Sequence, residues 1–378
     1  MICLEKVQNL RCFREVRKRI MDKSVKENIY VCHTYYHVYI SILKEYALEK
    51  SKQHKSTLLL SKMSTEFEDL IDRVAKANIF DEVMEFDEKR SDYFRELDFF
   101  NVNQGNVFKN MIARIKFTKL LAKLQEPYIP VNFREYNNIY VFCDSDPIGY
   151  YLNQNKIYYH AVEDGYNSLQ YFSYVYFDNK GYFKIKVLMA KLNLIHIQDG
   201  MAKYCIDMEV NNVNEVLRPH KKLIGCSRAD LVDRLTDEEK QVILEVFIKD
   251  KVKLDHVLSN SEVKKTALIL TEPVCDDENR IRMIGDIVNM YDKEYCVIIK
   301  QHPKDMLDYS KVFPELIIAD RTVPMEMFNL LEAKFDVVVA ILTNTGSIKF
   351  AREIVILGHD FLDVYQDPTK AKFVYRDS

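Results

Sequence analysis

Several features that mark other protein classes are scarce in this chain. Trp is absent, and Gly and Pro number only nine each among 378 residues, so low-complexity linkers and turn-rich all-β architectures are not expected. The eight Cys residues include no CxxC pair, which argues against a structural zinc site. Reduced, scattered thiols are typical of a cytoplasmic protein, and we expect this location.

A strong charge of either sign is also missing. The formal net charge is −3, whereas nucleic-acid-binding domains are usually strongly basic, so no nucleic-acid partner is expected. The sequence contains no apolar run of about 18 residues that would predict a membrane span. Its first residues lack the apolar core of a signal peptide. Any membrane contact is therefore expected to be peripheral, on the inner face.

The chain does contain short apolar runs that alternate with amphipathic patterns, which is the βαβ signature of parallel sheets. Its length suits two domains. We predict a GT-B-like α/β fold, with two Rossmann-like domains that face each other across a cleft. Their predicted bounds are 1–250, with basic helical insertions, and 251–378. Strands are predicted at 28–32, 56–61, 81–86, 138–143, 156–162, 266–270, 295–300, 316–319, 337–341 and 354–357. Helices are predicted at 38–48, 66–77 after a Ser64/Thr65 cap, 144–151, 278–291, 324–334 and 346–352.

Ligands of such sheets bind beyond the carboxyl ends of the strands, so polar residues that follow predicted strands are the candidates for chemistry. His33 and Thr34 follow the first strand and begin its helix, where free N–H groups favour anions. Alternatively, His33 and His37 are ordinary residues of one helix face. The triplet Asp144-Ser145-Asp146 precedes Pro147, and we interpret it as a helix cap. No metal and no cofactor are expected.

Carboxylates at two other strand ends are candidates for a catalytic base. Glu163 and Asp164 precede Gly165 after a buried strand, and such a carboxylate can deprotonate an acceptor hydroxyl. The alternative is a simple Asp-Gly turn. Asp276 and Asp277 follow the strand at 266–270, where either carboxylate could act as the base or cap the next helix.

The second half also offers residues suited to a phosphate and a nucleoside. His302 follows an apolar strand directly, and Pro303 ends that strand, so the imidazole could assist a departing phosphate. Glu326 begins a predicted helix and could hydrogen-bond ribose hydroxyls. A hydroxyl-rich segment before the predicted helix 346–352 suits a phosphate cradle, or an ordinary helix cap. Its residues are Thr343, Asn344, Thr345, Gly346 and Ser347.

Together these motifs resemble those of bacterial sialyltransferases. The triplet at 163–165 is similar to their acidic D/E-D-G motif, and His302-Pro303 is similar to their HP motif. Segment 343–347 lies where they carry a paired Ser/Thr motif, but its hydroxyls are not adjacent. The opening segment 32–38 is most similar to glycosyltransferase family 52, the lipooligosaccharide sialyltransferases.

The resemblance implies an inverting, metal-independent enzyme that moves sialic acid from CMP-sialic acid to a terminal sugar, galactose, of a bacterial surface glycan. His302 would assist the departure of CMP, the hydroxyl segment would bind its phosphate, and Glu326 would bind the nucleoside. The base would be Asp164 by similarity to the acidic-triplet enzymes, or Asp276 or Asp277 by similarity to family 52. Residues 1–250 would form the acceptor side and 251–378 the donor side. Family 52 resemblance also makes a homodimer an expectation.

Two alternatives stay open at this stage. One is a capsule- or teichoic-type transferase that uses another CMP- or CDP-activated unit, and the other is a non-catalytic nucleotide- or glycan-binding protein. Basic amphipathic segments at 1–23, 108–124 and 183–194 predict helices that lie on an anionic membrane beside a glycolipid acceptor, or else solvated helix faces.

Overall fold

The computed structural model describes residues 26–48, 55–165, 168–171, 174–249, 251–259, 264–343 and 345–366. The chain divides into two compact units, Met1–Leu235 and Thr236–Ser378, called unit 1 and unit 2 below. The predicted basic segment at 1–23 and the site residue Asn344 lie outside the described residues.

Unit 1 is built on a seven-stranded sheet in the order β3-β2-β1-β4-β5-β6-β7. Every neighbouring pair is parallel. Ile29 and Val31 in its first strand are fully buried, as expected for a parallel sheet that is covered on both faces. The strands are β1 (Lys26–Cys32), β2 (Ser56–Ser61), β3 (Glu82–Phe86), β4 (Tyr136–Phe142), β5 (Tyr159–Val162), β6 (Cys205–Val210) and β7 (Leu223–Gly225).

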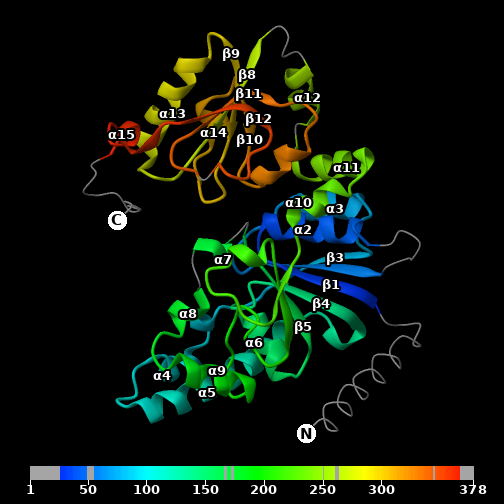
Figure 1. Cartoon of the computed structure of the whole chain (residues 1–378), viewed down its shortest axis with the longest axis vertical. Helices are drawn as coiled ribbons and strands as arrows, with labels where there is room; N and C mark the ends of the chain where they lie inside the picture. The colour runs from blue at the N-terminus through cyan, green and yellow to red at the C-terminus, as the bar shows by residue number, and fades with distance from the viewer. Residues whose placement is uncertain are drawn as a thin grey trace. The chain divides into compact units, whose positions relative to one another are not determined.

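Helices cover both faces of this sheet. The α-helices are α2 (Tyr35–Tyr46), α3 (Leu70–Lys76), α4 (Asp98–Asn101), α5 (Val107–Gln125), α6 (Pro147–Gln154), α7 (Ser168–Tyr171), α8 (Tyr174–Asp178), α9 (Phe183–Lys191) and α10 (Arg228–Asp233). Short 3-10 helices are η1 (Ser91–Tyr93), η2 (Arg95–Leu97), η3 (Glu126–Tyr128), η4 (Phe133–Glu135) and η5 (Val213–Glu215). Figure 1 shows α2 and α3 on one face of the sheet, and α5, α6 and α9 on the other.

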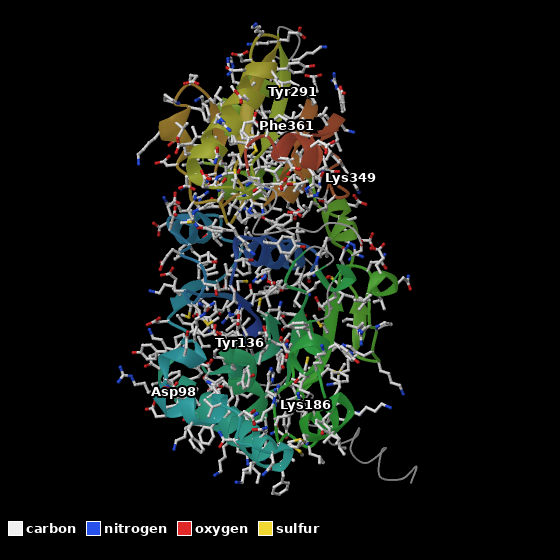
Figure 2. All side chains as sticks on the ribbon, turned by 90° about the vertical axis from the view of Figure 1, so that its left-hand side faces the viewer. Asp98, Tyr136, Lys186, Tyr291, Lys349 and Phe361 are labelled. Carbon is white, nitrogen blue, oxygen red and sulfur yellow. The ribbon has the colours of Figure 1, made fainter. Side chains whose placement is uncertain are left out.

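The main core of unit 1 lies between the sheet and α6. Ile139 and Val141 of β4 pack with Ile148 and Leu152 of α6. Tyr136, at the start of β4, is buried in the same cluster (Figure 2). Burial of these apolar side chains stabilises each by roughly 1.5–3 kcal/mol relative to exposure.

Unit 2 repeats the same topology with five parallel strands, in the order β10-β9-β8-β11-β12. Its strands are β8 (Lys265–Leu270), β9 (Tyr295–Lys300), β10 (Ile317–Ala319), β11 (Phe335–Ala340) and β12 (Ala351–Ile356). Its helices are α11 (Asp237–Phe247), α12 (Lys251–Ser259), α13 (Asp277–Tyr291), α14 (Tyr309–Val312), η6 (Met325–Leu330) and α15 (Gly358–Leu362). The apolar face of α13, with Met283 and Ile287, packs against Ile269 of β8 and Ile299 of β9.

The prediction of parallel α/β sheets in both halves is confirmed, but the helix predicted at 346–352 is wrong. Residues 345–350 form no helix, since a turn covers Gly346 and Ser347 and β12 begins at Ala351. The side chain of Asn329 donates to the Ser347 carbonyl at 3.1 Å and accepts from the Lys349 N–H at 2.9 Å. These bonds satisfy backbone groups that a helix would otherwise pair within itself.

Two further helix predictions are too long. The helix predicted at 66–77 begins only at Leu70, with Asp69 rather than Ser64 or Thr65 at its N-cap position. Glu68 has a φ of 50°, a left-handed conformation that a right-handed helix cannot include. The helix predicted at 324–334 is the short 3-10 helix η6, which Pro324 precedes.

Candidate functional site

Polar side chains gather at the carboxyl ends of the strands of unit 1. The strand order reverses between β1 and β4, and ligands of doubly wound sheets bind beside such a switch point. His33 follows β1, Asp146 lies in the loop after β4, Asp164 follows β5 and Glu88 lies two residues beyond β3. Hydrogen bonds join these residues into two small groups.

The first group pairs Asp164 with His37, a buried residue of α2. His37 Nδ1 accepts a hydrogen bond from the backbone N–H of His33 at 3.0 Å. The ring proton of neutral His37 is therefore on Nε2, which donates to Asp164 Oδ1 and to the Asp164 carbonyl, both at 2.9 Å. The His37 ring stacks on Phe142 with centroids 4.4 Å apart. His37 is thus fixed in one tautomer and one orientation.

The Asp164 carboxylate remains ionised in this setting. Burial acts to raise its pKa, but the hydrogen bonds from His37 and from the Cys143 thiol outweigh burial and lower the pKa below its ordinary value. The Cys143 Sγ lies 3.0 Å from Asp164 Oδ1. About 60% of the Asp164 side chain is exposed, so a substrate can reach an oriented carboxylate.

The second group joins His33, Glu88 and Asp146. His33 is buried, and its Nε2 lies 2.8 Å from Glu88 Oε2 and 3.5 Å from Asp146 Oδ2. Burial acts to lower the pKa of His33, but the two carboxylates outweigh it and raise the pKa. Burial also raises the pKa of Asp146 to about 7. The group therefore holds a proton near neutral pH.

His33, His37 and Cys143 bring three potential metal-ligating atoms within 4.8 Å of one another. Zinc binds a thiolate and imidazole nitrogens free of protons. Burial and the neighbouring carboxylates raise the pKa of the Cys143 thiol, and both ring nitrogens of His37 are hydrogen-bonded. We therefore assign these side chains to the hydrogen-bond network around Asp164.

The other predicted residues of unit 1 serve the backbone. The side chain of Thr34 accepts from the His37 N–H and caps α2. Glu163 is buried, and its oxygens accept from the N–H groups of Leu169 at 3.2 Å and Asn211 at 2.8 Å. Gly165 accepts from the Ser168 N–H. In the Asp144-Ser145-Asp146 triplet, which was predicted to cap a helix, Asp146 has the N-cap position of α6 but makes no capping hydrogen bond. Its carboxylate lies 3.5 Å from His33 Nε2 instead.

Unit 2 has a corresponding switch point between β8 and β11. Glu272, two residues beyond β8, is buried and accepts from the backbone N–H groups of Leu342 at 2.8 Å and Thr343 at 2.6 Å. The Thr343 hydroxyl also donates to Glu272. Glu272 thus fixes the start of the hydroxyl-rich segment, and the Thr343 hydroxyl is directed toward protein.

His302 lies two residues beyond β9, and no described residue is hydrogen-bonded to its Nε2. Its backbone N–H donates to Thr271 Oγ1 at 3.0 Å, and Thr271 in turn donates to the buried Asp305 at 2.9 Å. His302 Nδ1 accepts from the Lys304 N–H at 3.1 Å, so the proton of the neutral ring is on Nε2. Burial and the charges of Lys300 and Lys304 lower the pKa of His302 to about 4. At neutral pH it is an uncharged hydrogen-bond donor.

Lys300 interacts electrostatically with both His302 and Glu326. Lys300 is buried, donates to the Asp320 carbonyl at 3.1 Å, and has a pKa lowered by burial to about 8. Burial raises the pKa of Glu326, which its own backbone N–H and Lys300 partly offset. Among the described residues, no other group donates a hydrogen bond to the Glu326 carboxylate. This half-buried acceptor is therefore suited to the hydroxyl groups of a sugar.

The remaining candidates of unit 2 have local roles. Asp276 caps α13 by accepting from the Asn279 N–H at 3.0 Å. Asp277 is 73% exposed and pairs with Arg280. Pro303 is exposed directly after His302. The backbone of Thr345, Gly346 and Ser347 forms a turn in place of the predicted helix start, so the helix-end field expected for a phosphate cradle is missing there.

The sequence-based prediction did not identify three residues that contact the candidate site residues. Glu88, Glu272 and His37 each contact a predicted residue or segment. The signal for the two glutamates was the strand-end rule itself, since each lies two residues beyond a strand. The sequence places His37 on a helix face beside His33, and the fold reveals its contact with Asp164.

The sequence of this chain is similar to that of a known family. The model of the family described as glycosyltransferase family 52 matches residues 78–353. An uncharacterized protein of Haemophilus influenzae is 29% identical over 144 residues, which are 38% of this chain and 46% of that relative. The chain therefore matches less than half the length of that relative.

Solved structures show a similar fold. The 2,6-sialyltransferase of Photobacterium sp. JT-ISH-224, solved with CMP and lactose, has a TM-score of 0.52 and 11% identity, covering 90% of this chain and 74% of that one. The GT-B domain of the Photobacterium damselae sialyltransferase has a TM-score of 0.46 and 13% identity, covering 84% and 86%. The likeness to the first structure and the two parallel sheets confirm the predicted GT-B-like fold.

Proposed function

The chain belongs to glycosyltransferase family 52, and we propose that it transfers sialic acid from CMP-sialic acid to a terminal sugar, galactose, of a bacterial surface glycan. The transfer inverts the anomeric centre and needs no metal. Unit 2 takes the donor and unit 1 the acceptor. The observation that carries the proposal is the neutral His302, whose Nε2 proton is shared with no described residue.

His302 suits the leaving group of this reaction. When the bond between the anomeric carbon and the phosphate oxygen breaks, negative charge develops on that oxygen. A preorganised donor aimed at developing charge lowers the barrier, and the Nε2–H of His302 supplies one beside the cationic Lys300 and Lys304. Glu326 would accept from the ribose hydroxyls of the cytidine.

Asp164 suits the acceptor half. The oxygen of the acceptor hydroxyl attacks the anomeric carbon from the face opposite the phosphate, and its proton passes to the Asp164 carboxylate. A lowered pKa makes Asp164 a weak base, yet the hydroxyl becomes acidic as its bond to carbon forms. Asp276 and Asp277 are weaker candidates because one caps α13 and the other pairs with Arg280.

A peripheral membrane contact is a second part of the proposal. Helix α5 carries five Lys or Arg residues and no Asp or Glu, and α9 carries three Lys and no acid. Exposed apolar side chains accompany them, including Phe108 at 70% and Leu188 at 56% exposure. Cations beside exposed apolar groups favour anionic membrane surfaces. In the described part of the chain, every helix is too short or too polar to span a membrane.

Nucleotide binding tests the donor. Calorimetric titration with CMP, CDP, UDP and GDP, without metal, should give selective CMP binding that His302→Ala weakens. Donor hydrolysis and transfer from CMP-sialic acid then test the reaction. Selective binding of CDP would favour the teichoic-type alternative, selective UDP or GDP binding would contradict the CMP-sugar donor, and no binding would favour the non-catalytic alternative.

The base is tested by paired substitutions. Asp164→Asn should abolish most transfer while CMP binding stays unchanged, whereas Asp276→Asn, with an amide that can still cap a helix, should retain transfer. The opposite outcome would move the base to unit 2.

A further inference from the structure

Unit 1 contains a cavity that lies outside the residues assigned above to the transfer step. Its volume is about 680 Å³, within the range of roughly 300–1,000 Å³ typical of small-molecule sites. It lies between α5 and α9, which pack through a small apolar cluster that includes Met189 of α9 and Met111 of α5. Figure 2 shows Lys186 of α9 and Asp98, at the start of α4, near the same end of unit 1.

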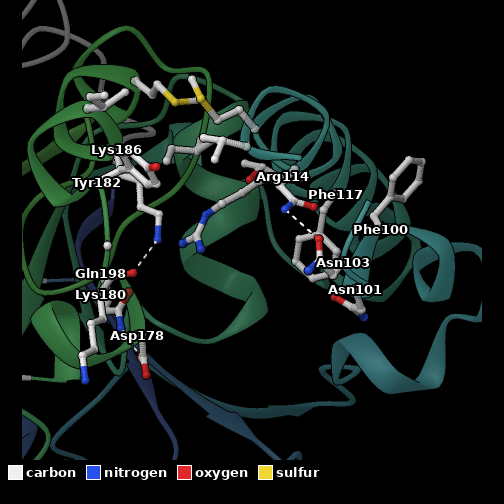
Figure 3. A pocket seen from close by; sticks show the side chains of 18 of the residues that line it. Phe100, Asn101, Asn103, Arg114, Phe117, Asp178, Lys180, Tyr182, Lys186 and Gln198 are labelled. Carbon is white, nitrogen blue, oxygen red and sulfur yellow. Dashed lines mark hydrogen bonds between the residues drawn. The ribbon is translucent and has the colours of Figure 1, made fainter. Parts of the chain in front are cut away.

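Two cations reach into this cavity without a carboxylate partner. Arg114 of α5 donates to the amide oxygen of the buried Asn179 at 2.8 Å, and Lys186 reaches only the Lys180 carbonyl, at 3.4 Å. Figure 3 shows both side chains extending into the same opening from opposite helices. Among the residues that the structure describes, no carboxylate forms an ion pair with either cation. Burial and the charge of Arg114 lower the pKa of Lys186, as expected where two cations approach each other without an anion.

The only acidic side chain among the lining residues is Asp178, and the Gln198 amide donates to it at 2.7 Å. An anion in this cavity would therefore meet three positive groups, Arg114, Lys180 and Lys186, and one carboxylate that is already hydrogen-bonded. The positive charge of the lining is complementary to an anionic ligand, and no described carboxylate neutralises Arg114 or Lys186.

The rest of the lining suits a saccharide. The rings of Phe117 and Tyr150 line the cavity. Figure 3 shows Phe117 together with the planar amides of Asn101, Asn103 and Gln198. Aromatic faces pack on the C–H face of a sugar, and amides donate to and accept from its hydroxyls. Small-molecule sites combine apolar walls with polar groups that converge on the ligand, and this lining carries both kinds of side chain.

The position of the cavity connects it to the acceptor side of the proposed reaction. Ser145 lines it, and this residue precedes Asp146, whose carboxylate faces His33. From these observations we propose that the cavity binds an acidic saccharide, a sugar that bears a phosphate or carboxylate group, and that this sugar belongs to the acceptor glycan. The assignment to the acceptor rests on the proposed function, whereas binding can be measured without turnover.

The test is isothermal titration of the full chain with galactose 6-phosphate, galacturonate, galactose and inorganic phosphate. We expect one acidic sugar to bind at least about tenfold more tightly than either galactose or inorganic phosphate, because the site recognises both the charge and the ring. Whichever acidic sugar binds more tightly identifies the charged group, phosphate or carboxylate, that the cavity recognises.

Matched variants locate the binding. Arg114→Gln and Lys186→Gln should each weaken the acidic sugar about tenfold. Lys184→Gln is the control, because Lys184 lies on the same helix, is exposed, and does not line the cavity. All three variants should bind CMP like the unaltered protein, and their far-UV spectra should match.

Three results would overturn the inference: no binding of either acidic sugar, equal affinity for inorganic phosphate, or equal weakening by the control substitution. The second result would mean a nonspecific anion site. Because CMP binding is recorded on the same samples, failure of the acidic sugar with intact CMP binding rejects the cavity proposal alone. Loss of CMP selectivity in the unaltered protein would reject the proposed function instead.

Discussion

Substitution of His37 tests whether this residue positions Asp164 for catalysis. His37→Phe keeps an aromatic ring that can stack on Phe142 but removes both nitrogens. The hydrogen bond from Nε2 to the Asp164 carboxylate, 2.9 Å long, is then lost. A hydrogen bond to a charged group contributes about 1.5–3 kcal/mol, which corresponds to a loss of roughly 10- to 150-fold in kcat/KM if it is lost from the transition state.

The pH dependence separates this role from a general loss of structure. Because the hydrogen bond from His37 lowers the pKa of Asp164, its removal should raise that pKa toward about 4. The base must be ionised, so the acid limb of the kcat/KM profile should move to higher pH in His37→Phe. The substitution also leaves the buried His33 N–H without its partner, which should cost about 1–3 kcal/mol of stability, so thermal unfolding is measured in parallel.

The assay is transfer from CMP-sialic acid to lactose across pH, for His37→Phe, Asp164→Asn and the double variant. If His37 acts through Asp164, its substitution has little further effect once Asp164 is already Asn. Additive losses, or an unchanged acid limb in His37→Phe, would refute the assignment of His37 as a positioning residue.

Three further predictions concern buried and titrating groups. Glu272→Ala removes the acceptor of three hydrogen bonds. It should lower the unfolding free energy by about 2–4 kcal/mol and weaken CMP binding, and calorimetry measures both effects. Glu272→Gln should retain most of the stability and most of the CMP affinity. Burial raises the pKa of Asp199 to about 7, so the folded state holds a proton that the unfolded state releases, and stability falls as pH rises from about 4 to 7. Asn tolerates the φ of 56° at position 199, so Asp199→Asn should make the unfolding temperature less dependent on pH over this range. An equally steep pH dependence in the variant would contradict the assignment of this proton to Asp199. Because His302 is neutral above about pH 4, the pH profile of kcat/KM should show no titration of this ring between about pH 6 and 8. If kcat/KM instead rises toward pH 5 in the unaltered protein but not in His302→Ala, the neutral-donor role is contradicted.

Much of the fold follows from apolar patterning. The strands predicted at 56–61 and 295–300 agree with β2 and β9 to the residue, because each is a short buried run between polar residues and parallel strands need no other signal. The helix predicted at 346–352 failed because its backbone is held by Asn329, 18 residues away from Ser347. Local sequence cannot report a hydrogen bond from a side chain so distant.

The rule that ligands bind at strand ends identified candidate residues but could not predict which side chains they contact. It selected His33, Asp164 and His302, all of which lie at strand ends in the structure. It could not show that His37 donates to Asp164 or that Glu272 accepts from Thr343, because both contacts join segments more than 70 residues apart in sequence. The roles of these residues in catalysis remain predictions.

The two switch points share one topology but differ in chemistry. That of unit 1 is rich in carboxylates, with Glu88, Asp146 and Asp164 around two buried histidines, and such a set is suited to accept and hold a proton. That of unit 2 places His302 beside two lysines, a setting that stabilises charge on a departing phosphate. A transferase must do both, since the acceptor loses a proton while the donor gains negative charge on its leaving oxygen. A binding protein needs neither an exposed, oriented carboxylate nor a histidine whose proton is left unshared, and this pairing of opposite electrostatic settings favours the transferase over the non-catalytic alternative.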